Sequence, residues 1–112
     1  MAGHETTRSK NYVYVPTRLN EAYMKVHKTL EKGFYTPLQT IIMTSEALKD
    51  AGLFVEKPPT FDIAPLIDPA NNRINNGESF SVEDARSLSR QTVAALARAG
   101  VLDMEACMSL VE

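Results

Sequence analysis

The sequence predicts an all-α fold: a small domain of three to four helices, with a short extended N-terminal segment and a long proline-rich loop. Three observations favour this fold. Apolar residues recur at helical spacing in separate stretches, these stretches follow threonine or serine residues of the kind that cap helices, and glycines follow their ends. With 112 residues and 44% hydrophobic content, the chain can form one core, so residues 1–112 are treated as a single domain.

The N-terminal part should precede the first helix. Residues 1–10 are polar, and we expect a mobile tail there. The following NYVYV, residues 11–15, alternates aromatic and β-branched side chains and predicts a short extended piece. Thr17 should then cap a helix that Gly33 ends in the left-handed conformation, with an apolar face formed by Leu19, Tyr23, Val26 and Leu30.

A second helix is predicted from Pro37 to about Ala51, because Thr36 can cap it, proline tolerates the first position, and Gly52 follows. Its opening PLQTIIMTS carries no charge, and its apolar side chains do not form one stripe. Either this helix is central in the bundle, or a partner covers its second face. One face should carry Leu38, Ile41 and Leu48, and the nearly opposite face Met43 and Ala47.

Residues 56–80 are expected to form a long irregular loop, since they contain four prolines and an asparagine-rich end. A slack linker would be poor in apolar side chains, yet this stretch contains Phe61, Ile63, Leu66 and Ile67. We expect Phe61 to pack on the body. Leu66 and Ile67 could either pack there or reach a partner.

A third helix is predicted over 82–99, with Ser81 and Asp84 as its capping box, and a short fourth helix after Asp103. The third helix carries Arg86, Arg90 and Arg98, so a DNA-binding regulator that uses helix 82–99 is the alternative function. Against it stand acidic residues in the helix's first turn and a net charge of −2 for the chain.

The sequence contains no catalytic or cofactor motif: GxGxxG, GxxxxGK[ST] and a serine nucleophile elbow are all absent. His27 has no second ligand at metal-binding spacing, and Cys107, the single cysteine, should be a packed thiol. We therefore predict no enzyme activity, no cofactor and no metal. With neither a signal-like segment nor an apolar run long enough to span a membrane, a soluble cytoplasmic protein is expected.

In size, acidic balance and the succession LNEAYMKVHKTL, TPLQTIIMTSEALKDAG and a late alanine-rich helix, the chain resembles small bacterial quorum-sensing anti-activators of the QslA kind. The resemblance implies binding to a LuxR-type transcription factor and occlusion of its dimerisation surface, without direct contact to nucleic acid. No functional residue of those proteins is assigned to a position in this sequence, because no short motif matches.

The residues themselves favour a regulatory protein that acts through protein–protein contacts, with a possible homodimer. Met24 adds to this expectation. It lies among polar residues on what should be the solvent-exposed face of the first helix, and methionine adapts well to binding surfaces. The predicted partner-binding residues are Leu38, Ile41, Ile42, Met43, Met24, Leu66 and Ile67.

Overall fold

The computed structural model describes residues 17–111, so the predictions for the tail and for NYVYV lie outside the described residues. Within this range the fold is all-α, as predicted, and its backbone pairing outside helices is limited to two isolated bridges. The helices are α2 (Arg18–Leu30), α3 (Pro37–Asp50), α4 (Ala64–Asn75), α5 (Val82–Arg98) and α6 (Met104–Met108).

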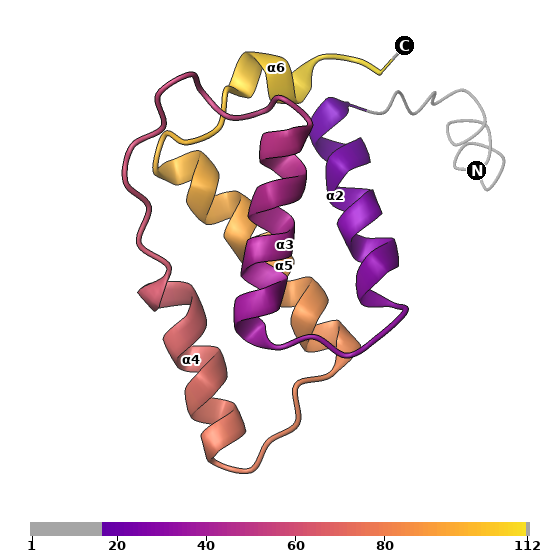
Figure 1. Cartoon of the computed structure of the whole chain (residues 1–112), viewed down its shortest axis with the longest axis vertical. Helices are drawn as coiled ribbons and strands as arrows, with labels where there is room; N and C mark the ends of the chain where they lie inside the picture. The colour runs from indigo at the N-terminus through magenta and orange to yellow at the C-terminus, as the bar shows by residue number, and fades with distance from the viewer. Residues whose placement is uncertain (1–16, 112) are drawn as a thin grey trace, which may run out of the picture.

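Helix α3 is the central element. It packs against α5 behind it and lies between α2 and α4, while α6 crosses the end of the bundle near the start of α2 (Figure 1). The largest core cluster lies at that end and includes Leu48, Leu53, Leu96 and Cys107. Two further clusters fill the α2–α5 contact and the contact of α4 with α3 and α5. None of the described helices is both long enough and apolar enough to cross a membrane.

The predicted helix starts are confirmed. The side chains of Thr17, Thr36, Ser81 and Asp103 each accept a hydrogen bond from the backbone N–H three residues later, which satisfies a donor that the helix itself leaves unpaired. At α3 and α5 the third residue returns the bond, because Gln39 and Asp84 accept from the backbone N–H of their caps.

One predicted helix end is confirmed and one is wrong. Gly52 has a φ of 77°, which glycine adopts without strain, and the next residue, Leu53, donates its N–H to the Leu48 carbonyl and is fully buried. Gly33 does not adopt a positive φ. Helix α2 ends earlier, at Leu30, with Glu31 still in the right-handed region, so the turn needs no left-handed residue.

The prediction of an irregular loop over 56–80 is wrong for residues 64–75, which form α4. Pro65 lies in the first turn, where a missing N–H costs little, and the Asp62 carboxylate accepts the N–H of Ala64 at 3.0 Å. Leu66 and Ala70, one turn apart, both pack in the cluster with Ile41 and Leu88. This tertiary burial stabilises a helix that contains Pro69 and that propensity alone disfavours.

Candidate protein-interaction surface

Helix α3 buries a line that includes two threonines, Thr40 and Thr44, together with Ile41. The threonine hydroxyls fit the interior because each donates to the carbonyl one turn earlier, at 2.9 and 2.8 Å. With this line inside, Leu38 and Ile42 remain 43% and 46% exposed. Leu38 is thus exposed, although Ile41 and Leu48, with which it was predicted to share a face, are buried.

The exposed flank of α3 lies next to α4. Leu38 and Ile42 are one helical turn apart, and Leu38 is also one turn from Ile41, which packs in the cluster with Leu66 of α4. The two helices are in contact and run antiparallel (Figure 1). On α4, Ile67 is half-buried against the same cluster, and Ile74, two turns further on, is exposed. We call Leu38, Ile42, Ile67 and Ile74 the α3–α4 surface.

The structure sorts the seven predicted partner-binding residues into three groups. Leu38, Ile42 and Ile67 belong to the α3–α4 surface. Ile41 and Leu66 were predicted to contact a partner but are buried in this chain's own core, in the cluster that Ile67 packs against, so they are not accessible to one. The remaining two, Met43 and Met24, lie elsewhere.

Met43 is half-buried against the α2 cluster of Val26 and Leu30, on the other flank of α3. Met24 is exposed on α2, apart from the α3–α4 surface. Met43 therefore packs within this chain, and Met24 lies on a different helix from Leu38 and Ile42.

The exposed apolar residues that the sequence reasoning missed include Phe34 and Ile74. Phe34, in the connection between α2 and α3, is 94% exposed and lies one helical turn before Leu38 in the sequence. The sequence feature that could have identified Phe34 is a large aromatic residue in a short connection, directly after Gly33 and before the capping Thr36. Ile74 was missed because its segment was taken for a loop, although its seven-residue distance from Ile67 has the helical period.

The phenylalanine of the proline-rich stretch packs as predicted. Phe61 is half-buried and contacts two of the core clusters, and Ile63 packs on the cluster beneath α4. This stretch therefore closes over the body rather than projecting from it.

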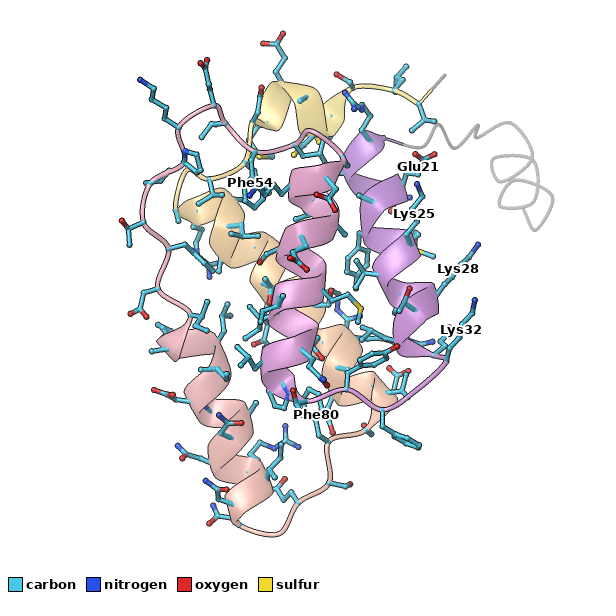
Figure 2. All side chains as sticks on the ribbon, viewed as in Figure 1. Glu21, Lys25, Lys28, Lys32, Phe54 and Phe80 are labelled. Atoms are coloured by element: carbon cyan, nitrogen blue, oxygen red, sulfur yellow. The ribbon has the colours of Figure 1, made fainter. Side chains whose placement is uncertain are left out.

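The outer side of α2 is basic. Lys25, Lys28 and Lys32 project away from the body in one row that begins at Glu21 (Figure 2). Helix spacing explains the row, since residues three and four apart share a face. This row lies across the molecule from α4 (Figure 2).

One of the three arginines of α5 is engaged by carboxylates. Arg86 forms ion pairs with Glu83 on its own helix and with Glu31 at the end of α2. Contact with a phosphate would require breaking both pairs. Arg90 and Arg98 are exposed on the same helix.

The titratable groups of the described residues have structural roles. Three or more metal-ligating side chains do not come together anywhere in residues 17–111. Burial raises the pKa of the Cys107 thiol, and Asp103 adds to the effect. The His27 ring lies 5.2 Å from the Tyr23 ring, and its Nε2 is buried with no hydrogen-bond partner in that range.

At the start of α5, the backbone N–H and the hydroxyl of Ser81 both donate to the Asp84 carboxylate, and they lower its pKa. Arg73 of α4 lies 3.7 Å from the same carboxylate and bonds Glu78 at 3.0 Å. These contacts connect the end of α4 to the start of α5.

Comparisons with known proteins give no relative from which a role could be transferred: no family model, no curated protein and no solved structure matches this chain.

Proposed function

We propose that this chain is a regulatory protein that works by binding another protein through the α3–α4 surface. One observation carries the proposal: two helices in contact each carry large aliphatic side chains that are exposed to solvent, and the helices share a core cluster. Exposed apolar side chains that gather on neighbouring elements mark interaction sites more often than isolated ones do. Burying these side chains in a complex would stabilise the complex by roughly 25 cal/mol per Å² of apolar area removed from water.

The mechanism of the proposal is occlusion. A partner that associates with itself through an apolar patch would lose that patch to the α3–α4 surface, because both surfaces compete for the same area. The resemblance to quorum-sensing anti-activators suggests a LuxR-type transcription factor as the partner, in the cytoplasm, with loss of its dimer as the result. No catalysis, cofactor or direct contact with nucleic acid is part of this proposal.

The experiment has two arms. In the first, the purified chain is mixed with a LuxR-type regulator and the species are sized by sedimentation velocity. We expect a mixed complex that grows as the regulator's dimer declines. If no mixed species forms with LuxR-type regulators and their dimers persist, the anti-activator proposal is wrong.

The second arm tests the surface itself. Ile42→Glu and Ile74→Glu place a charge on the α3–α4 surface, whereas Gln39→Glu places the same charge on an exposed α3 position outside it. Capture of the partner should fall at least about tenfold for the first two, which corresponds to about 1.4 kcal/mol, and persist for the third. Equal capture by all three, with unchanged circular dichroism, would exclude this surface. Sedimentation velocity of the chain alone shows whether it instead forms a homodimer.

A further inference from the structure

The outer side of α2 concentrates positive charge in a chain whose net charge is −2. Lys25, Lys28 and Lys32 are all exposed and project from the body in one row (Figure 2). Among the described residues, none of the ion pairs involves these lysines. Glu31, which lies between two of them in the sequence, is paired with Arg86 of α5 instead. Within that part of the chain, the three lysine charges are therefore not neutralised by a direct contact.

For α2 taken alone, this row is unfavourable. Like charges three and four residues apart on a helix repel each other. The helix dipole favours cations in the last turn, which accounts for Lys28, but Lys25 precedes that turn. Glu21 lies one turn before Lys25 and does not form an ion pair with it in the structure. A surface that holds like charges against their mutual repulsion is suited to a partner of opposite charge.

Two exposed apolar side chains border the row. Phe34, two residues beyond Lys32, is 94% exposed, and Met24, one turn before Lys28, is 42% exposed. Aromatic residues and methionine are enriched in protein interfaces, where charged residues form the rim. We call Met24, the three lysines of the row and Phe34 the α2 edge.

The exposure of Phe34 belongs to an ordered turn. On one side of it, the N–H of Lys32 donates to the Thr29 carbonyl at 3.0 Å. On the other side, Tyr35 packs half-buried against the α2–α5 cluster, and Thr36 caps α3. Because the chain is held on both sides of Phe34, a partner that covers this side chain needs to order little backbone.

The geometry of the row selects the class of partner. From Lys25 to Lys32 the row spans roughly 10 Å along α2. Carboxylates at positions i, i+3 and i+7 of a facing helix reproduce this spacing. A second copy of α2, placed antiparallel, would instead bring lysine opposite lysine. A long polyanion or an anionic bilayer would extend beyond the row and meet the rest of a chain that is negative overall.

We propose that the α2 edge binds an acidic helical segment of another protein. The carboxylates of this segment lie on the lysine row, and an apolar side chain of the segment packs on Phe34. The α2 edge lies across the molecule from α4 (Figure 2), and it shares no residue with the α3–α4 surface. This inference is therefore independent of the function proposed above.

The test measures peptide binding to the full chain by fluorescence anisotropy. Two labelled helical peptides of about 15 residues have the same composition and charge. The patterned peptide places its glutamates at i, i+3 and i+7 with a leucine beyond them, and the scrambled peptide distributes these residues around the helix. Lys28→Glu combined with Lys32→Glu reverses two charges of the row. The matched control, Lys49→Glu combined with Lys57→Glu, reverses two exposed lysines outside it.

We expect the unchanged protein to bind the patterned peptide more tightly than the scrambled one. Affinity for the patterned peptide should fall at least about tenfold in the row variant, fall by a smaller factor in Phe34→Ala, and persist in the control. Circular dichroism checks the fold of each variant. Lys28→Gln combined with Lys32→Gln repeats the measurement without charge reversal if the row variant unfolds.

Equal binding of the two peptides, or no binding of either, overturns the proposal. So does an equal loss of affinity in the row variant and the control, or an unchanged affinity in Phe34→Ala. The same assay with phosphatidylserine vesicles and with duplex DNA covers the other anions. Tighter binding of either one than of the patterned peptide would assign the row to that anion and overturn the proposal as well.

Discussion

The hydroxyls of Thr44 and Ser89 lie 2.7 Å apart and join α3 to α5 in the centre of the molecule, where both side chains are buried. Thr44 also donates to the Thr40 carbonyl at 2.8 Å, so its proton is used within α3, and Ser89 must supply the proton between the helices. The closest helix contact of the fold thus contains a satisfied polar pair rather than aliphatic side chains alone.

This pair predicts a non-additive pair of substitutions. Thr44→Val keeps the volume but removes the acceptor of Ser89, and we expect it to lower the free energy of unfolding by about 1–3 kcal/mol. Ser89→Ala removes the other partner and should also destabilise. The double variant should cost less than the sum, because neither hydroxyl is then left unpaired. Urea unfolding of all four proteins measures the coupling, and simple additivity would contradict the assignment.

The division between the core and the α3–α4 surface predicts that substitutions in the two places change stability by very different amounts. Leu66→Ala removes a buried side chain from the cluster with Ile41 and Leu88, so the free energy of unfolding should fall by about 2–5 kcal/mol. Ile42→Ala removes an exposed one and should change it by no more than about 0.5 kcal/mol. Denaturant unfolding compares them. Similar losses for both would mean that Ile42 is covered within the monomer.

Leu66→Ala should also act locally. Because Leu66 is the buried residue of α4, amide exchange should quicken first in α4 and later in α5. Uniform acceleration along the chain would instead show that α4 unfolds only with the rest of the molecule.

The Cys107 thiol should react slowly with disulfide reagents in the native protein. It is fully buried, and burial raises its pKa, so the reactive thiolate is scarce at neutral pH. We expect labelling by a disulfide reagent to be slow in buffer and fast in denaturant. A native rate equal to the denatured rate would show that the α6 end of the core is open. Unfolded protein in denaturant is the internal reference.

The Asp84 cap predicts how stability responds to acid. Hydrogen bonds from Ser81 keep the pKa of Asp84 lower in the folded than in the unfolded chain. The resulting stabilisation is complete above the unfolded pKa and disappears as the pH falls through the folded pKa. The stability difference between the unchanged protein and Asp84→Asn should therefore be largest at neutral pH and shrink as the pH falls through the folded pKa of Asp84.

Ser81→Ala provides the companion measurement for this cap. It removes the hydroxyl donor but keeps the backbone N–H, so it should weaken the pH dependence without abolishing it. A stability difference that does not change with pH in either variant would contradict the role of Asp84.

The candidate surface was only partly predictable from the sequence. The uncharged opening of α3 identified Leu38 and Ile42, because a surface helix normally has a polar half. The sequence could not tell which of the neighbouring apolar residues lies inside, since threonines that bond their own helix took the interior positions around Ile41. It also gave no reason to place α4 beside α3.

What the sequence determined by itself is local. Capping side chains at Thr17, Thr36, Ser81 and Asp103 and the glycine after α3 depend on hydrogen bonds and backbone angles within a few residues, so they could be recognised without any fold. The tertiary structure alone decided that residues 64–75 are helical and that Leu66 is an anchor. Burial against Ile41 and Leu88 stabilises that helix, and those partners are distant in the chain.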